Sequence, residues 1–500
     1  FMLIYLLLDD PAAAMSYGRV WLLAAVVGVV GISLIRVYGL AVYPTMHSAD
    51  EPWVLSHGVS VAETSKLTDP MIPERDIPLN YFAYALGAWL RVVGIGLWEA
   101  RLFTFLLTFV VITLTGLAAG NLYGRRTALL TAAFLVCSAT LMSAARIRHD
   151  IGLAVMLAAS LWVYSLALRR EQRGLHLLAG LLMGWGMFAH YNATGLGVAA
   201  AASLYGPRYM AGLKQDKRWP EAGLWLYGLG GLIGAGTVML TQMLPYLDTF
   251  FKNNSPEPVS LEKYLDTFFE YLTLARQSSQ LEVLLISAGA AAAMWRQRVE
   301  DWTIASMLVL GPLALTVIAP NANPLYIVPL TPFYGLAFGS MIGEGWRQNQ
   351  TTQTLRRGPA AAAILILAAN LGLTLRPPLD YVRQRGAMRP DAPAPAQWIL
   401  DHVDQDATLA GEHYYYLWLT DYDYISPMVA RVDLQGSLAN SSSEAELWDA
   451  LHPDYFIIDG GRTSYPILRD LIQSGYLDAR GYEVVMRSGA VTIYGKVSPE

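Results

Sequence analysis

The chain has 500 residues, of which 54% are hydrophobic and only 15% are charged, and its formal net charge is -5. This composition excludes an ordinary soluble enzyme and is typical of a protein that crosses a membrane several times. The sequence has no lysine- and arginine-rich tract, which argues against nucleic acid as a partner. The single cysteine, Cys137, excludes an internal disulfide and a cysteine-based metal site.

Apolar runs of the length that a bilayer requires recur along most of the chain from residue 19 onward. Ahead of them, residues 1–18 form an N-terminal segment. Its apolar start, 1–8, is too short to span a membrane and lacks the basic flank of a signal peptide. We predict about eleven transmembrane helices from the longer runs. Their ranges are 19–41, 102–122, 127–146, 151–168, 175–190, 192–209, 222–244, 280–295, 303–320, 324–342 and 359–376.

Basic residues cluster at every second loop between these runs. The clusters are Arg125 with Arg126, Arg169 and Arg170 with Arg173, Lys214 and Lys217 with Arg218, Arg296 with Arg298, and Arg347 with Arg356 and Arg357. The positive-inside rule places these loops in the cytoplasm. The segment 42–101, the turn at 146–150 and the chain after about residue 377 are therefore expected outside it. The long run 175–210 has basic residues near both ends, so we divide it at His190-Tyr191-Asn192, which then faces outward.

The first outer segment, 42–101, has two features of interest. Asp50 and Glu51 form an acidic pair in SADEPWV, and a run of aromatic and aliphatic residues follows at 81–90. Asn80 and Arg91 interrupt this apolar run. The pattern predicts an amphipathic helix that lies in the membrane interface, where tyrosine and tryptophan prefer to sit.

Short mixed elements replace the long apolar runs after the proline-rich linker 389–395, which is stiff. Residues 390–500 are predicted to form a small soluble α/β domain. The predicted helices are 396–402, 444–451 and 467–472, and the predicted strands are 407–419, 455–458 and a hairpin of 483–486 with 491–494. The aromatic stretch 411–424 is interpreted either as a polysaccharide-binding surface or as a buried strand.

The stretch SAARIRHDIG, residues 143–152, concentrates charge between two apolar runs. If this stretch continues a helix, Arg146 and Asp150 lie four residues apart and share a face. Ionisable groups at a membrane face are costly unless they are paired or reach water, so they indicate a functional site. The alternative is structural, because charges at a helix end often reach the headgroups and an arginine–aspartate pair can serve only as scaffold.

Several motifs follow one another in an order that resembles a known superfamily, although each motif alone is weak evidence. They are ADE, IPLNYF, EARLFTFLL, LYGRRTALLTAAF, AARIRHD, LAGLLMGWGMFAHYNA and PLYIVPLTPFYGLAFG. The order is similar to that of the protein O-mannosyltransferases and aminoarabinose lipid A transferases, which have the GT-C fold. The resemblance covers residues 19–376. It implies an all-α polytopic membrane domain of the GT-C type over 19–380, followed by the small extracytoplasmic α/β domain.

The resemblance also implies a function. A membrane-embedded inverting glycosyltransferase would take a sugar from a polyprenyl-phosphate donor and place it on an extracytoplasmic protein, lipid or polysaccharide. It would lie in the lipid bilayer of the plasma (inner) membrane, with the active site outside the cytoplasm. Asp50 matches the family's acid that accepts the acceptor hydroxyl's proton, and Asp150 matches a second acid of the same site. Some relatives bind a divalent metal ion, which Asp50 and Asp150 would share here.

The remaining candidate residues have weaker signals. A departing lipid phosphate requires cations, and the nearest candidates are Arg146, Arg148, His149 and Arg75. Glu51 is either a second carboxylate of the site or a solvated loop charge. His190 and Tyr326 would line the substrate cavity, and the alternative for His190 is a hydrogen bond between packed helices.

A function of another class fits the same scaffold. The chain could be a non-catalytic accessory in lipid-linked sugar transport, or a structural subunit of a membrane envelope complex. Asp50 and Asp150 discriminate between the two readings, because an accessory has no need of two carboxylates at a cation-lined cavity. Asn321 to Asn323 stand where relatives often have a lysine or arginine, which weakens the prediction of donor-phosphate contacts there.

Overall fold

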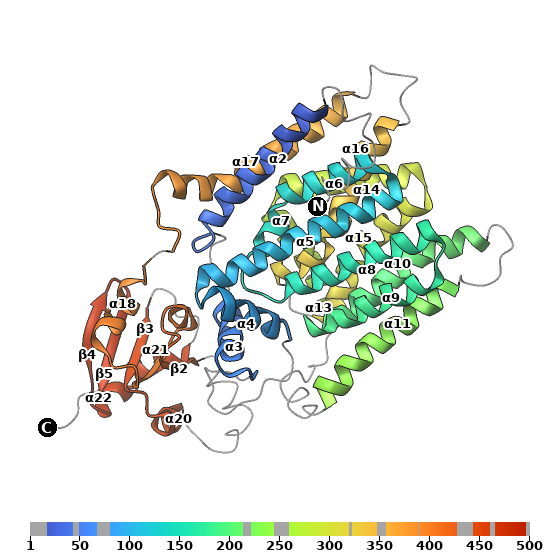
Figure 1. Ribbon diagram of the computed structural model, residues 1–500. Helices are drawn as coiled ribbons and strands as arrows, with labels where there is room; N and C mark the ends of the chain where they lie inside the picture. Colours follow the sequence, from blue (N-terminus) through green and yellow to red (C-terminus); the bar gives the residue numbers. More distant parts are fainter. Residues whose placement is uncertain are drawn as a thin grey trace. The chain divides into compact units, whose positions relative to one another are not determined.

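The computed structural model describes residues 18–43, 50–67, 81–213, 222–244, 260–319, 323–347, 357–389, 391–427, 444–460 and 466–496. These residues form mainly helices, with one small sheet near the C-terminus (Figure 1). The chain divides into two compact units. One holds residues 1–44, 102–245 and 256–386, and the other holds 45–101, 246–255 and 387–500. The predicted fold class, a helical membrane region followed by a small α/β domain, is confirmed.

Long apolar helices dominate the first unit. In chain order its elements are α2 (Gly18–Tyr38), most of α5 (Leu97–Tyr123), α6 (Arg125–Cys137), α7 (Ala139–Ser143), α8 (Asp150–Arg170), α9 (Arg173–Trp185), η1 (Gly186–Phe188), α10 (Ala193–Leu213), α11 (Ala222–Val238), η2 (Met239–Met243), α13 (Leu261–Ser278), α14 (Gln280–Arg296), α15 (Val299–Ile318), η4 (Pro324–Leu330), α16 (Thr331–Arg347) and α17 (Arg357–Arg383). Within the described part of the chain, six helices are long and apolar enough to cross a membrane. They are Leu97–Tyr123, Asp150–Arg170, Ala222–Thr241, Val299–Ile318, Pro324–Glu344 and Ala361–Arg383. The protein is therefore an integral membrane protein, and the other predicted spans also coincide with helices, the span 127–146 with two consecutive ones.

Several predicted spans are interrupted. The predicted single span 127–146 is wrong, because α6 ends before Ser138 and the short helix α7 follows it. The predicted division of 175–210 is right, since η1 and a turn separate α9 from α10. The segment at 324–330 is a 3₁₀ helix that runs into α16, and α17 continues through Pro377 and Pro378 to Arg383, past its predicted end.

Helices α9 and α11 pack against each other through glycines. A Cβ atom at Gly180 of α9 would lie 1.9 Å from the carbonyl oxygen of Tyr227, and one at Gly230 of α11 would lie 2.0 Å from that of Leu177. Small residues let two helix backbones approach closely in a membrane, where packing replaces the hydrophobic effect as the main attraction between helices.

We expect Gly230→Ala to destabilise the protein by about 1–3 kcal/mol, because the added methyl group forces the two helices apart. Gly228→Ala is the matched control on the same helix, since a Cβ atom there meets no atom within 4 Å. The control should be stabilising by roughly 0.5–1 kcal/mol through helix propensity. Thermal unfolding of the purified variants measures both effects, and equal melting temperatures would contradict the packing account.

Residues 45–101 belong to the second unit, and their described part holds the helices α3 (Asp50–Thr64) and α4 (Tyr81–Val93) ahead of the start of α5. The amphipathic segment is helical, as predicted, whereas α3 was not predicted. Arg91 of α4 donates hydrogen bonds to the carbonyl oxygens of Ala62 at 2.9 Å and Val61 at 2.8 Å, which closes the C-terminal end of α3. Helix α3 also packs against η5 (His413–Leu417) of the C-terminal region. The two sequence-distant segments therefore fold as one body.

The C-terminal region is built on a five-stranded sheet of order β2-β1-β3-β5-β4. Strands β2 (Asp423–Ile425), β1 (Thr408–Gly411) and β3 (Tyr455–Asp459) are parallel, and β5 (Val491–Lys496) and β4 (Tyr482–Ser488) complete the sheet in antiparallel pairing. The helices are α18 (Ala394–His402), α20 (Glu444–Leu451), α21 (Pro466–Gln473) and α22 (Tyr476–Ala479). The predicted strand 407–419 is wrong beyond Gly411, because the chain turns there into the 3₁₀ helix η5.

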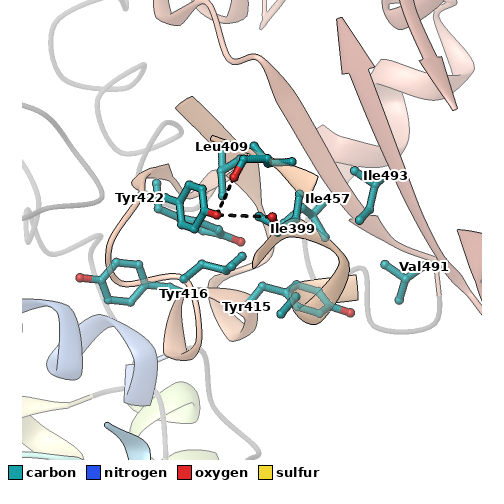
Figure 2. Close-up of a cluster of buried hydrophobic side chains, with 12 residues drawn as sticks. Ile399, Leu409, Tyr415, Tyr416, Tyr422, Ile457, Val491 and Ile493 are labelled. Atoms are coloured by element: carbon teal, nitrogen blue, oxygen red, sulfur yellow. Dashed lines mark hydrogen bonds between the residues drawn. The ribbon is translucent and has the colours of Figure 1, made fainter. Parts of the chain in front are cut away.

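The aromatic stretch 411–424 lies mainly in the core of this domain. Tyr415, Tyr416, Tyr422 and Tyr424 are buried with aliphatic residues of α18 and the strands (Figure 2). The hydroxyl of Tyr422 donates to the carbonyl oxygen of Val403 at 3.0 Å, which satisfies its polar end. The buried reading of these tyrosines is therefore right, although they do not form one strand.

Candidate functional site

Three interruptions of regular helix meet at one place in the first unit. They are the loop 144–149 between α7 and α8, the turn 189–192 between η1 and α10, and the 3₁₀ helix η4, and their flanking elements are in contact. Irregular backbone at membrane depth occurs where it is buried in protein or lines a cavity. Of the predicted site residues, Arg146, Arg148, His149, His190 and Tyr326 lie on these segments, and Asp150 directly follows the first segment.

Arg148 and Asp150 form a buried ion pair. The Arg148 Nε donates to Asp150 Oδ2 at 2.8 Å, and the two side chains are 4% and 3% exposed. Asp150 is the first residue of α8, where the positive end of the helix dipole favours a carboxylate. The condition for Arg146 and Asp150 to share a helix face is not met, because the chain is not helical between the end of α7 at Ser143 and the start of α8 at Asp150. Arg146 lies on the same loop and is half-buried.

Aromatic rings surround the ion pair. The ring centroids of His149 and His190 are 4.6 Å apart, and those of His190 and Tyr326 are 5.1 Å apart. The guanidinium carbon of Arg148 lies 5.8 Å from the centroid of the Tyr326 ring, within the range of a cation–π interaction. The site thus joins one cation, one carboxylate, two imidazoles and a phenol.

A hydrogen bond from the backbone determines which ring nitrogen of His190 carries the proton. The N–H of Asn192 donates to His190 Nδ1 at 3.0 Å, so Nδ1 carries no proton. The neutral ring then carries its proton on Nε2, which makes Nε2 a hydrogen-bond donor. This tautomer suits an anionic oxygen better than a metal ion.

A divalent ion remains chemically compatible with part of the site. One potential ligand atom from each of His149, Asp150 and His190 lies within 4.8 Å of the others. The hydrogen bond to His190 Nδ1 opposes ligation by this ring, since a ligating Nε2 would have to lose its proton to Nδ1. His149 and Asp150 are then too few protein ligands for a closed metal site.

One carboxylate oxygen of Asp150 can still accept a hydrogen bond. Its Oδ1 is buried and has no hydrogen-bond partner among the described residues. A buried acceptor without a donor in the protein is costly, so Oδ1 can accept a hydrogen bond from a ligand or a water molecule. The arrangement offers an acceptor in Asp150 Oδ1, which suits a sugar hydroxyl, and a cation in Arg148, which suits a phosphate.

Comparison with known proteins gives the family context. The family model described as dolichyl-phosphate-mannose-protein mannosyltransferase matches residues 78–240. The crystal structure of ArnT from Cupriavidus metallidurans bound to undecaprenyl phosphate aligns with a TM-score of 0.69 and 14% identity, over 95% of this chain and 99% of that one. The Archaeoglobus fulgidus oligosaccharyltransferase in complex with Zn and sulfate aligns with a TM-score of 0.53 and 12% identity, over 94% and 73%. No curated protein matches the sequence.

The chain has the GT-C fold. The family match and the structural matches agree with the resemblance drawn from the sequence motifs, which is thereby confirmed. The matched range 78–240 includes both the Arg148–Asp150 pair and His190, so the family model covers most of the site.

A second buried ion pair of this GT-C protein lies in the other compact unit. Arg101 of α5 donates to both carboxylate oxygens of Glu51 on α3, with Nε–Oε1 at 2.7 Å and Nη2–Oε2 at 2.8 Å. Each side chain is 1% exposed. The reading of Glu51 as a solvated loop charge is therefore wrong. With both oxygens bound to Arg101, Glu51 anchors the helix that begins at Asp50.

The other predicted site residues are described only in part. Asp50 is the first residue of α3, and the position of its side chain lies outside the described part of the chain. Arg75 also lies outside the described residues. The sequence reasoning missed Arg101, although it stands in the EARLFTFLL motif, and it missed Asn192, whose backbone role leaves no signal in the side-chain pattern.

We expect Glu51→Gln to destabilise the protein by about 3–5 kcal/mol, because the Arg101 charge then stays buried without its counter-charge. The double variant Glu51→Met, Arg101→Met should recover most of this loss, since two apolar side chains remove both charges together. Thermal unfolding checks both variants. A melting temperature of Glu51→Gln equal to that of the parent would show that the pair is not the anchor.

Proposed function

We propose that the chain is a membrane-embedded inverting glycosyltransferase, which transfers a sugar from a polyprenyl-phosphate donor to an extracytoplasmic acceptor. One observation carries this proposal: the buried Arg148–Asp150 pair, with His149 and His190 close to Asp150, at the meeting of three interrupted segments in a GT-C fold. The similar ArnT structure, which holds undecaprenyl phosphate, supports a donor of this class.

The donor phosphate is assigned to Arg148, with the donor Nε2–H of His190 beside it. Negative charge grows on the phosphate as the bond to the sugar breaks, and fixed donors in a water-poor site stabilise that charge strongly. A guanidinium is the better partner because its planar fork can bind two phosphate oxygens. The ion pair with Asp150 holds the guanidinium in place and keeps its charge from being unpaired before the donor arrives.

The match to the family's motifs assigns the acceptor hydroxyl to Asp50, with Asp150 as the second acid. A hydroxyl is a weak nucleophile, so a positioned carboxylate must accept its proton as the oxygen attacks the anomeric carbon. Asp50 takes this proton, the new oxygen–carbon bond forms, and the bond from that carbon to the phosphate oxygen breaks. The polyprenyl phosphate leaves as the anion, and the configuration at the sugar carbon is inverted.

The orientation in the membrane is part of the proposal. Asp150 begins α8, and the basic residues Arg169 and Arg170 end it, 21 residues in all. A helix of that length is about 30 Å long, which is the thickness of the bilayer core. With the basic end in the cytoplasm, the candidate site and the C-terminal domain lie outside it.

The test is sugar transfer by the purified protein in lipid from a panel of polyprenyl-phosphate sugars. Asp50→Asn and Asp150→Asn should each lower the rate by roughly 10²–10⁴-fold, the usual worth of a positioned acid or base. Asp404→Asn, a change of an exposed aspartate in the C-terminal domain, is the matched control and should keep full activity. Product analysis should show inversion at the anomeric carbon.

Two outcomes would contradict the proposal. Full activity of both Asp50→Asn and Asp150→Asn would exclude these carboxylates from the reaction. Absence of transfer from every donor, together with binding of the donor lipids that survives both substitutions, would favour the non-catalytic accessory.

A further inference from the structure

The break between α6 and α7 lies just upstream of the loop that carries Arg148. Ser138 separates the two helices, and α7 is only five residues long. A helix break leaves N–H and C=O groups without intrahelical partners, and these must be satisfied inside a membrane domain. Their partners come from three other helices of the same unit.

Glu282 of α14 binds the start of α7. Its Oε1 accepts a hydrogen bond from the Ser138 hydroxyl at 2.5 Å, and its Oε2 accepts from the backbone N–H groups of Ala139 at 2.9 Å and Thr140 at 3.2 Å. Ser138 Oγ in turn accepts from the N–H of Leu141 at 3.0 Å. One buried carboxylate, 1% exposed, thus satisfies most of the first turn of α7.

The last carbonyl groups of α6 accept hydrogen bonds from side chains of α2 and α17. Arg36 of α2 donates to the carbonyl oxygen of Val136 at 2.7 Å, and Asn370 of α17 donates to that of Cys137 at 2.8 Å. The hydroxyl of Ser279 donates to Asn370 Oδ1 at 2.6 Å. The position of the break is therefore fixed by direct contacts from α2, α14 and α17.

The loop between α7 and Arg148 is closely held. The Thr104 hydroxyl of α5 donates to the carbonyl oxygen of Ala145 at 2.7 Å. Ala144, Ala145 and Ile147 are 4%, 2% and 0% exposed. In a close-packed interior a shift of one segment displaces its neighbours. A shift of α7 will therefore move Arg148 and, through the ion pair, Asp150.

We propose that Glu282 is a positioning residue, which holds α7 so that Arg148 and Asp150 meet the donor phosphate. The inference rests on the proposed function of that pair. An intramembrane carboxylate is costly, and capping alone does not require one, because Ser138 already provides a neutral cap. A carboxylate has the acceptor capacity for three donors on two oxygens, which a neutral side chain of similar size does not match.

The experiment compares Glu282→Ala and Glu282→Gln with Asp301→Asn, a control that changes a similarly buried carboxylate away from the loop 144–149. The readouts are the melting temperature, kcat and KM for the donor, and the Kd for undecaprenyl phosphate in lipid nanodiscs. We expect Glu282→Ala to lower kcat/KM by roughly 10²-fold, the cost of a misplacement of about 1 Å. It should also raise the Kd. Glu282→Gln should lower kcat/KM less than Glu282→Ala, because the amide oxygen can still accept from the N–H groups of Ala139 and Thr140 but the carboxylate's second acceptor oxygen is lost.

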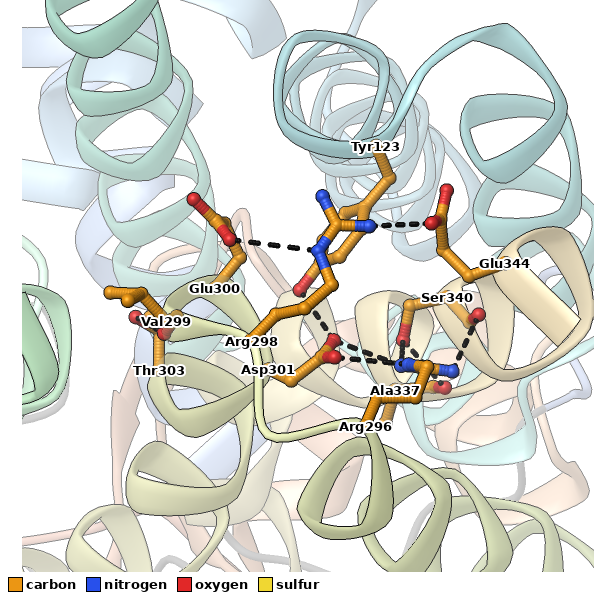
Figure 3. A network of polar contacts seen from close by, with 10 residues as sticks. All are labelled: Tyr123, Arg296, Arg298, Val299, Glu300, Asp301, Thr303, Ala337, Ser340 and Glu344. Atoms are coloured by element: carbon orange, nitrogen blue, oxygen red, sulfur yellow. Dashed lines mark hydrogen bonds and ion pairs between the residues drawn. The ribbon is translucent and has the colours of Figure 1, made fainter. Parts of the chain in front are cut away.

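The control is Asp301→Asn, in the polar network of Figure 3. Asp301 is 0% exposed, and Arg296 Nη2 at the far end of α14 contacts its Oδ1 at 2.9 Å. Tyr123 donates to the same oxygen at 3.1 Å. This buried carboxylate holds helices together without contact to the loop 144–149. The control should lower the melting temperature and leave KM and the Kd unchanged.

Equal effects of Glu282→Ala and Asp301→Asn on KM and on the Kd would overturn the proposal, since Glu282 would then be structural only. If Glu282→Ala does not fold, Thr104→Val decides, because it removes one hydroxyl contact to the loop while keeping the side-chain shape. A raised Kd in Thr104→Val supports the proposal, and an unchanged Kd contradicts it. If the parent protein transfers no sugar, the proposed function fails, while the Kd comparison still tests the positioning.

Discussion

Backbone that departs from helical geometry inside a membrane domain must find partners for its N–H and C=O groups, and this constraint organises the first unit. The break at Ser138 is satisfied by Glu282, Arg36 and Asn370. At η4, the side chain of Asn323 accepts from the N–H of Leu325 at 3.0 Å. The turn at Asn192 uses the ring of His190. Each interruption is thus stabilised by a polar side chain that an uninterrupted helix would not need.

The same constraint brings chemistry to one place. The meeting of three interruptions gathers the polar residues Arg148, Asp150 and His190 within one cluster. Buried charge is tolerated there because it is paired. The pair Asp301–Arg296 follows the same rule at the other end of α14, yet both carboxylate oxygens and all three guanidinium nitrogens have partners within the protein. The Arg148–Asp150 pair differs, because Asp150 Oδ1 has no hydrogen-bond partner among the described residues and can accept a hydrogen bond from a ligand.

Much of the fold could be predicted because apolar length and basic loops are local signals. The spans, the division near His190 and most elements of the C-terminal domain follow from them. The break at Ser138 could not be predicted, since the partners that stabilise it stand far away in the sequence. The pairing of Arg148 with Asp150 was missed for a related reason: helical periodicity was assumed across a loop. The short helix α3 was missed because its small and polar residues, such as His57 and Ser60, are buried by tertiary contacts that composition does not reveal.

The candidate site was predicted more securely in its members than in its geometry. Arg148, His149, Asp150, His190 and Tyr326 were chosen from charge and motif order, and they are found together. Their distances, the tautomer of His190 and the anchoring of Glu51 by Arg101 depend on packing. The tautomer of His190 favours an anion beside this ring, and the ion pair with Arg101 makes Glu51 an anchor of α3. The sequence alone predicts neither property.

The most direct test of the account is an experimental structure of the protein in lipid with undecaprenyl phosphate bound. The account predicts that the phosphate lies within hydrogen-bond distance of the Arg148 guanidinium and of His190 Nε2, with Asp150 still paired to Arg148. A phosphate bound elsewhere, with Arg148 and Asp150 closed on each other and remote from it, would contradict the assignment of the donor site.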